Sequence, residues 1–193
     1  GHEGELLAFD TGPGNALMDD WALRHTGRPV DEDGALARRG HADGEIVRRF
    51  LAHPYFAETP PKSLDRDDFG HLLPHHLSPE DGAATLLAMT ASSIAHAAKS
   101  FPAAPLQFLV SGGGRHNPVL MEALRAQLGA AVAPVEAFGW DGDALEAQAF
   151  AYLAVRSLRG LPLSFPGTTG VSLPQTGGRL DRPGARSTHV GST

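Results

Sequence analysis

The sequence contains no cysteine, and this absence excludes disulfide scaffolds, thiol catalysis and cysteine-ligated zinc sites. Basic side chains are outnumbered, with 16 Lys and Arg against 22 Asp and Glu and a formal net charge of −6. No basic run is longer than two residues, so a nucleic-acid partner that depends on neutralising phosphates is not expected. No apolar stretch reaches membrane-spanning length, because Thr, Ser and His interrupt the most apolar segment, residues 83–98. We therefore expect a mildly acidic, cytoplasmic globular protein without a membrane partner.

The start of the chain also lacks the features of a targeting segment. The first twenty residues hold five acids and no basic segment, so no signal peptide is expected. Residue 1 is Gly rather than Met, and an apolar run begins within a few residues of it. We expect from this that the chain is cut from something longer.

Two strands that end in glycine-rich turns predict the fold class. Residues 6–9 read as a buried strand that enters the turn 10–14 and then a helix over 15–25. Residues 106–110 read as a second strand, followed by the turn 111–114 and a helix over 117–128. The helix over 15–25 is expected to bury one apolar face, and Asn117 is expected to cap the helix that follows it. Other helices are expected over 78–100, starting at Ser78 and buried on most sides, and over 141–158, with Leu145 and Tyr152 on an apolar face. A strand is expected at 131–135. This order predicts one α/β domain, whose ligands bind at the carboxyl ends of the strands.

The segment from Phe9 to Asn15 carries the strongest local signal for a site. Asp10 would end a strand, where the sheet holds a carboxylate while it faces an open cleft. Gly12 and Gly14 allow the backbone to approach a ligand, and the amides that open the next helix favour an anion. The alternative is that Asp10 only caps that helix, and the pattern alone leaves both interpretations open.

Three other features are weaker candidates. The turn Gly112–Gly114 removes every Cβ, so a flat ring or a sugar would fit against the backbone, although a tight strand-to-helix turn needs the same residues. Lys62 follows two prolines on a stiff loop and would hold a phosphate or carboxylate, or would simply be solvated. Glu146 would bind sugar hydroxyls, or would only favour the helix dipole.

A metal site is not expected from this sequence. His71 and His75 have the i,i+4 spacing of helical ligands, but Pro74 breaks the helix that this spacing requires. Asp141 and Asp143 match only the first positions of a calcium loop. No Walker phosphate loop, nucleophile elbow or dinucleotide fingerprint is present.

Taken together, several motifs resemble one known family. They are Phe9–Asp19, Pro60–Ser63, Ser111–Pro118, Leu145–Ala154, Gly160–Pro162 and Thr168–Gly170. In this order and spacing, over about residues 5–184, they resemble the C-terminal part of anhydro-N-acetylmuramic acid kinases. The resemblance implies the sugar kinase/Hsp70/actin superfamily. The expected fold is an RNase H-like (actin-like ATPase) α/β lobe, a mixed sheet flanked by helices, over residues 1–184. A disordered tail over 185–193 is expected to follow.

The resemblance also implies an activity. Members of this family open the ring of 1,6-anhydro-N-acetylmuramic acid with water and phosphorylate the freed O6 with ATP and Mg²⁺, which serves peptidoglycan recycling and amino-sugar catabolism. By this resemblance Asp10 is the general base that activates the water. Glu146, Lys62 and Asn15 would bind the substrate, and a homodimer is expected at full length.

The nucleotide would be bound on the glycine side of the site. The resemblance assigns this role to five glycines: Gly12, Gly14, Gly112, Gly113 and Gly114. The family's Gly-Thr-Ser-Leu-Asp-Gly phosphate loop does not occur in this chain. A truncated, non-catalytic copy therefore stays open as an alternative, as does a kinase for a different hexose.

Overall fold

The alanine-rich segment after Ser78 forms the central helix of the computed structural model, which describes residues 6–65 and 68–181. This helix, α3, spans Pro79–Ala97. Ser78 caps it by accepting a hydrogen bond from the Asp81 backbone N–H at 3.0 Å, and Pro79 occupies its first turn. Its small side chains let neighbouring helices approach closely, and eleven of its residues are buried. The predicted start and burial of this helix are confirmed.

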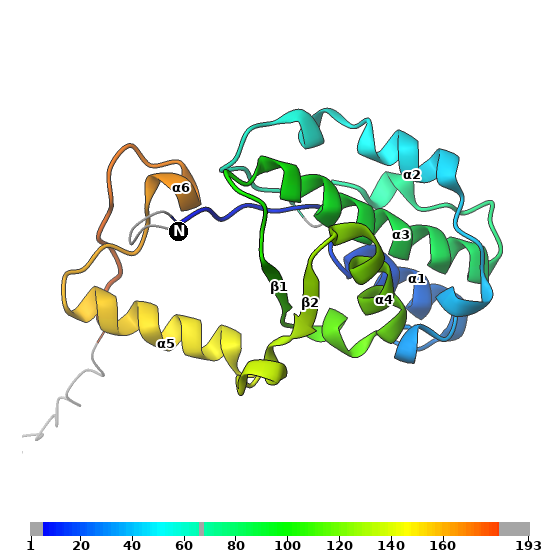
Figure 1. The fold of residues 1–193 in the computed structure, drawn as a ribbon. Helices are drawn as coiled ribbons and strands as arrows, with labels where there is room; N and C mark the ends of the chain where they lie inside the picture. Colours follow the sequence, from blue (N-terminus) through cyan, green and yellow to red (C-terminus); the bar gives the residue numbers. More distant parts are fainter. Residues whose placement is uncertain (1–5, 66–67, 182–193) are drawn as a thin grey trace, which may run out of the picture.

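Three helices pack around α3: α1 (Ala16–Thr26), α2 (Gly44–Leu51) and α4 (Pro118–Leu128) (Figure 1). Asn117 caps α4, as expected, by accepting from the Val119 and Leu120 amides. The expected apolar face of α1 is buried, with Trp21 1% exposed. Trp21 packs on α3 where Gly82 has no side chain, since a Cβ there would lie 2.1 Å from the indole ring.

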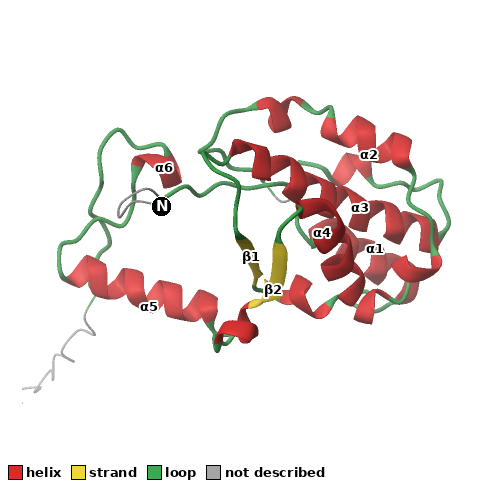
Figure 2. Cartoon of the chain, viewed as in Figure 1, coloured by secondary structure: helices red, strands yellow, loops and turns green. Residues whose placement is uncertain are grey.

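The sheet is small and parallel, with strands β1 (Gln107–Val110) and β2 (Ala131–Pro134) joined through α4 (Figure 2). Its register pairs Gln107 with Ala131 and Val110 with Pro134. Over the described residues the fold is mostly helical, and the larger mixed sheet expected from the sequence is not present there. Outside these strands, the structure records one isolated antiparallel bridge, between Ser164 and Gln175.

The predicted buried strand over residues 6–9 is wrong. The segment is extended, but Leu6 and Leu7 are 61% and 38% exposed. Instead of pairing in a ladder, Ala8 N–H donates to the Gly167 carbonyl and Asp10 N–H to the Lys62 carbonyl. One bond goes to α6 and the other to the loop that contains Lys62, so no neighbouring strand is present among the described residues to cover the apolar side chains.

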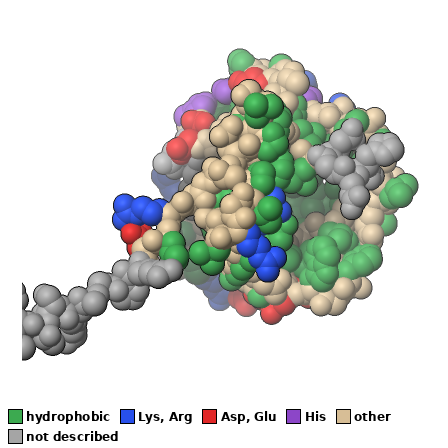
Figure 3. All heavy atoms as spheres, turned by 90° about the vertical axis from the view of Figure 1, so that its left-hand side faces the viewer, with side chains coloured by type: hydrophobic (Ala, Val, Ile, Leu, Met, Phe, Trp, Pro, Cys, Tyr) green, Lys and Arg blue, Asp and Glu red, His purple; other side chains and the backbone are tan. Residues whose placement is uncertain are grey.

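Two further helices, α5 (Leu145–Leu158) and α6 (Pro166–Thr169), lie to one side of the helical body (Figure 1). None of the residues of α5 is buried, so the apolar face predicted for this helix is largely open. Tyr152 is 60% and Phe150 65% exposed, and Figure 3 looks onto this side of the molecule. The helix is tied to the chain that follows it by the bond from Ser157 Oγ to the Gly177 carbonyl.

Short 3-10 helices fill the connections: η1 (Glu32–Gly34), η2 (Ala37–Arg39), η3 (Pro54–Ala57), η4 (Gly70–Leu72), η5 (Ala98–Ser100), η6 (Gly113–His116) and η7 (Val135–Phe138). The core lies between α1, α2, α3 and α4, where Phe50, Phe56 and Phe69 pack against one another with ring centroids 4.7–5.7 Å apart. No helix within the described ranges is both long and apolar enough to cross a membrane. The tail predicted over 185–193 lies outside the described residues.

Candidate functional site

Asp10 is held at three points by the loop that runs from Tyr55 to Leu64. Its backbone N–H donates to the Lys62 carbonyl at 3.1 Å, and its carbonyl accepts the Tyr55 hydroxyl at 2.6 Å. Its carboxylate accepts the Leu64 backbone N–H at Oδ2, at 2.8 Å. The residue is nevertheless exposed. Asp10 is thus a fixed carboxylate that solvent can reach, and it is not the N-cap of α1, a position that Asn15 occupies.

Tyr55 and Lys62 form the support beneath Asp10. Tyr55 is 5% exposed, and its burial, followed by the charge of Asp10, raises the pKa of its hydroxyl to about 12. The hydroxyl therefore stays protonated at neutral pH and remains a donor. The Lys62 ammonium donates to the Tyr55 carbonyl at 2.7 Å and lies 4.3 Å from the ring centroid of Tyr55. Burial lowers the pKa of Lys62.

Lys62 also faces a small open cavity. The cavity has a volume of about 220 Å³ and is lined by Pro61, Lys62, Ser63, Thr168 and Thr169. An ammonium has three donors, and the bond to the Tyr55 carbonyl uses one of them. The arrangement can accept a polar oxygen beside Asp10, between the 60–63 loop and α6.

The two glycines after Asp10 have different surroundings. Gly12 packs on α3, since a Cβ there would lie 2.6 Å from Ser93 Oγ, so its lack of a side chain serves helix packing. Gly14 adopts a positive φ of 58°, and no atom lies within 4 Å of the place a Cβ would take. Its carbonyl accepts the Thr90 hydroxyl at 2.8 Å. Of the two, only Gly14 presents open backbone.

Asn15 brings the two glycine-rich turns together. Its side chain does not cap α1 and instead lies against the second turn, 3.2 Å from where a Cβ of Gly114 would be and 3.9 Å from one of Gly113. Gly112 has a positive φ of 72° and open space around its Cα. Five of the predicted site residues therefore lie close together where the two turns meet: Gly14, Asn15, Gly112, Gly113 and Gly114.

A cavity of about 380 Å³ opens beside this meeting point. Asn15, Gly113, His116 and Asn117 line one part of it, with Met18 and Val30 as its apolar members. The remaining lining residues are acidic: Asp19, Asp31, Glu32 and Asp33. Such a wall favours a neutral or cationic group and disfavours a phosphate.

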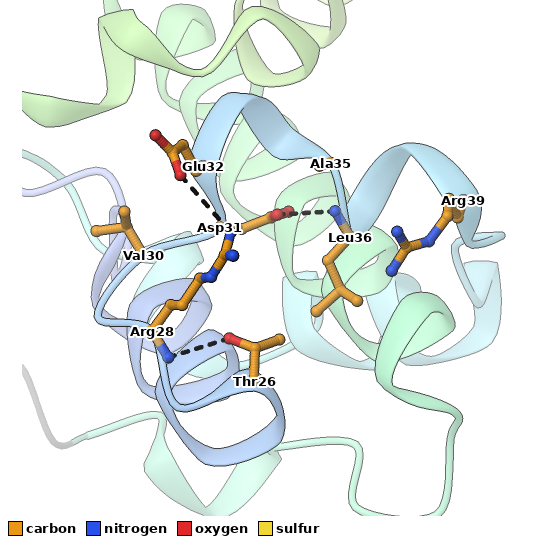
Figure 4. A pocket seen from close by; sticks show the side chains of 8 residues that line it. All are labelled: Thr26, Arg28, Val30, Asp31, Glu32, Ala35, Leu36 and Arg39. Carbon is orange, nitrogen blue, oxygen red and sulfur yellow. Dashed lines mark hydrogen bonds and ion pairs between the residues drawn. The ribbon is translucent and has the colours of Figure 1, made fainter.

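A neighbouring cavity of about 320 Å³ shares the residues Val30, Asp31 and Glu32 with it (Figure 4). Its polar groups mostly satisfy one another: the Asp31 carboxylate accepts from the Leu36 amide at 2.7 Å, and Arg28 lies 3.7 Å from Glu32. None of the residues predicted for the site lines it. We assign this second cavity to the packing of the 28–39 loop.

Glu146 lies in the first turn of α5 and is exposed. The described residues provide no hydrogen bond or ion pair to its carboxylate, and they do not bring it into contact with Asp10. The three histidines considered for a metal, His71, His75 and His76, likewise form no ligand cluster. No group of three or more His, Asp or Glu side chains suited to a metal occurs within residues 6–65 and 68–181.

Sequence reasoning missed two residues of the site, Tyr55 and Arg115. Tyr55 is 45 residues from Asp10 in the chain, and no local pattern links them. Arg115 follows the glycine turn directly, yet its side chain is buried and bonds to Glu136 at 2.7 Å, 21 residues away. The signal that the sequence offers for Arg115 is its place as a basic residue directly after the glycine turn 112–114.

Comparison with known proteins now adds to this geometry. The family model of anhydro-N-acetylmuramic acid kinase matches residues 2–181 of the chain. The chain belongs to the anhydro-N-acetylmuramic acid kinase family. The family implies the actin-like ATPase fold.

Named relatives agree with this assignment. The chain is 62% identical over 185 residues to the anhydro-N-acetylmuramic acid kinase of Paramagnetospirillum magneticum, covering 94% of this chain and 52% of that protein. The relative from Rhodospirillum rubrum is 60% identical over 172 residues, covering 89% and 46%. The relative from Acidiphilium cryptum is 56% identical over 187 residues, covering 95% and 52%. The chain thus spans about half the length of the curated relatives it matches.

Proposed function

We propose that residues 1–184 form the C-terminal, RNase H-like lobe of an anhydro-N-acetylmuramic acid kinase. The reaction is the ATP-dependent conversion of 1,6-anhydro-N-acetylmuramic acid to N-acetylmuramic acid 6-phosphate, with hydrolytic opening of the anhydro ring. Family membership supports this proposal, and the parallel strand–helix–strand unit β1–α4–β2 suits such a lobe. The single observation that carries the proposal is the exposed Asp10 carboxylate, which the 55–64 loop holds in place. Asp10 lies a few residues before Gly14 and Asn15 in the chain, and Asn15 lies against the turn 112–114.

Asp10 acts in this proposal as the general base. Its carboxylate takes a proton from the water that attacks the anomeric carbon, while the bond from that carbon to O6 breaks. The freed O6 then attacks the γ-phosphorus of ATP, the bond from that phosphorus to the bridging oxygen breaks, and ADP leaves. Three hydrogen bonds to the backbone and side chain of Asp10 keep the carboxylate in place, so little reorganisation is needed at the moment of proton transfer.

Lys62, Asn15 and Glu146 are the proposed sugar-binding residues. Lys62 faces the small cavity next to Asp10, where its remaining donors suit a hydroxyl or carboxylate oxygen of the substrate. Asn15 offers an amide at the boundary between the Asp10 side and the glycine turn. Glu146 has no partner within the described residues, so its carboxylate is available to accept from sugar hydroxyls.

The proposed nucleotide side is the surface formed by Gly14 and Gly112–Gly114, with Gly12 packed on α3 behind it. Gly14 and Gly112 present backbone without steric obstruction, against which a flat purine or ribose can lie. The acidic wall of the adjoining 380 Å³ cavity favours the neutral nucleoside end over the phosphates. We therefore place the nucleoside toward the turn 112–114 and the phosphates toward Gly14 and the start of α1, whose amides favour anions.

Magnesium is the remaining component of this proposal. The part of the chain that the structure describes holds no cluster of three or more possible ligands, so these residues do not fit a preformed magnesium site. Mg²⁺ commonly reaches kinases on the phosphates of ATP with one or two carboxylates. A cytoplasmic location and a homodimer at full length complete the proposal.

Replacing Asp10 by Asn in the full-length protein tests the role of this residue. We expect turnover of the anhydro sugar to fall by about two or more orders of magnitude, as loss of a general base commonly causes. The matched control is Asp181→Asn, at an exposed carboxylate paired with Arg179. Phosphorylated sugar is measured from labelled ATP. Near wild-type turnover of Asp10→Asn would remove Asp10 from the mechanism.

The alternative proposal is a non-catalytic copy of such a kinase. It predicts that the complete gene product neither binds nor phosphorylates anhydro-N-acetylmuramic acid. Calorimetric titration of that sugar into the complete gene product separates the two candidates. Titration of other hexoses in the same way tests whether the site has a different sugar substrate.

A further inference from the structure

Arg115 is the one buried charged residue among those that the structure describes. Its side chain is 4% exposed, and each guanidinium nitrogen has an acceptor. Nε donates to Glu136 Oε1 at 2.7 Å, one Nη to the Gly112 carbonyl at 2.9 Å, and the other lies 2.8 Å from Asp143 Oδ1. Such full pairing is what makes burial of a guanidinium tolerable.

The three acceptors belong to three different segments. Gly112 opens the glycine turn, Glu136 lies in η7, and Asp143 lies in the loop before α5. Gly142 rests directly on this group: its N–H donates to Glu136 Oε1, and a Cβ there would lie 2.5 Å from Arg115 Nε. The loop 141–143 therefore packs against the guanidinium without room for a further methyl group.

This contact matters because α5 has no buried residues of its own. Its first turn carries Glu146, three residues after Asp143. The position of Glu146 relative to the glycine turn therefore depends on how the loop 141–143 is fastened. Arg115 is the buried residue that holds the loop 141–143 in place.

We propose that Arg115 is a positioning residue that holds the glycine turn and the Glu146 helix in one fixed geometry, so that the nucleotide and sugar sides of the site are coupled. The proposal rests on the proposed function for the identity of the two ligands. The planar guanidinium serves three acceptors in different directions, which a lysine ammonium on a flexible stem cannot reproduce. Lysine at this position would keep the charge and lose the bridge.

The two carboxylates remain charged where the enzyme would work. The pKa of Asp143 is lowered, chiefly by its bond to Arg115. The pKa of Glu136 is lowered by its own backbone amide and next by Arg115. Both stay ionised at neutral pH, so the bridge does not come apart by protonation there.

The test uses Arg115→Lys in the full-length protein, with Arg39→Lys as the matched control at an exposed ion pair. For Arg115→Lys we expect the KM values of both ATP and the anhydro sugar to rise about tenfold, with kcat within about threefold of wild type. Asp143→Ala removes only the acceptor nearest α5. It should raise the KM of the sugar and leave that of ATP within twofold. Arg39→Lys should change neither value.

A readout that needs no activity accompanies the kinetics. In hydrogen–deuterium exchange, Arg115→Lys should increase exchange both at residues 112–116 and at residues 141–148, relative to wild type and to Arg39→Lys. If wild type phosphorylates no sugar, the proposed function fails, and the exchange data still decide whether Arg115 joins the two segments. A lower melting temperature with unchanged KM values and unchanged exchange at 141–148 would overturn the bridge. So would a change confined to the glycine turn and the KM of ATP.

Discussion

The hydroxyl of Tyr55 offers a test of how the site holds its base, because Tyr55→Phe removes one oxygen and leaves the rest of the support in place. The ring stays packed against Phe56 and Phe69. The Lys62 ammonium still donates to the backbone carbonyl of residue 55 and still lies over its aromatic ring. What is lost is the 2.6 Å bond to the Asp10 carbonyl. The variant thus isolates one of the three points that fix Asp10.

The magnitude follows from the energetics of a single hydrogen bond. A bond of this kind contributes about 1 kcal/mol, and the Asp10 carbonyl is near solvent, so water can replace the lost donor in part. We expect the free energy of unfolding to fall by about 1 kcal/mol. If the same bond orients the base during the reaction, kcat falls about fivefold, since ~1.4 kcal/mol corresponds to a factor of ten.

Urea unfolding and steady-state turnover of the full-length protein measure the two effects. The matched control is Tyr152→Phe, at an exposed hydroxyl on α5 that accepts a hydrogen bond from Arg156. We expect that control to match wild type in both assays. If Tyr55→Phe matched wild type as well, the backbone bonds to Lys62 and Leu64 would suffice to hold Asp10, and the reasoning about Tyr55 would be refuted.

Two other predictions concern stability. Folding raises the pKa of Tyr55 from 10.0 to about 12. The protonated hydroxyl therefore contributes to the free energy of unfolding fully below pH 10, and this contribution is lost as the pH rises toward 12. The urea midpoints at pH 9 and pH 11 should differ less in Tyr55→Phe than in wild type. Gly82→Ala should destabilise the fold by about 1–3 kcal/mol, because the new Cβ would lie 2.1 Å from the Trp21 ring. Gly44→Ala in α2 is the control, because a Cβ there has open space around it. It should be neutral or should stabilise the fold by up to about 1 kcal/mol. Thermal unfolding followed by circular dichroism compares these two, and equal melting temperatures would contradict the packing argument.

Local signals in the sequence determined the helices and the central strands. Ser78 and Pro79 begin α3, and Asn117 and Pro118 begin α4, because capping and proline placement act within a few residues of a helix start. The apolar spacing of residues 17–22 likewise fixed the buried face of α1. The turn at 112–114 was predicted for the same reason, since Gly112 takes a positive φ of 72°, which favours glycine.

Tertiary structure alone decided the rest. The segment 6–9 has the composition of a buried strand, but a strand needs a partner strand, and here the segment bonds instead to α6 and to the loop that contains Lys62. The support of Asp10 by Tyr55 and the three-way contact of Arg115 join residues tens of positions apart, and such pairs leave no mark in local composition. Sequence therefore determined where α3 and α4 begin and which residues carry charge, while the packing of distant segments decided which of those charges are held, shielded or exposed.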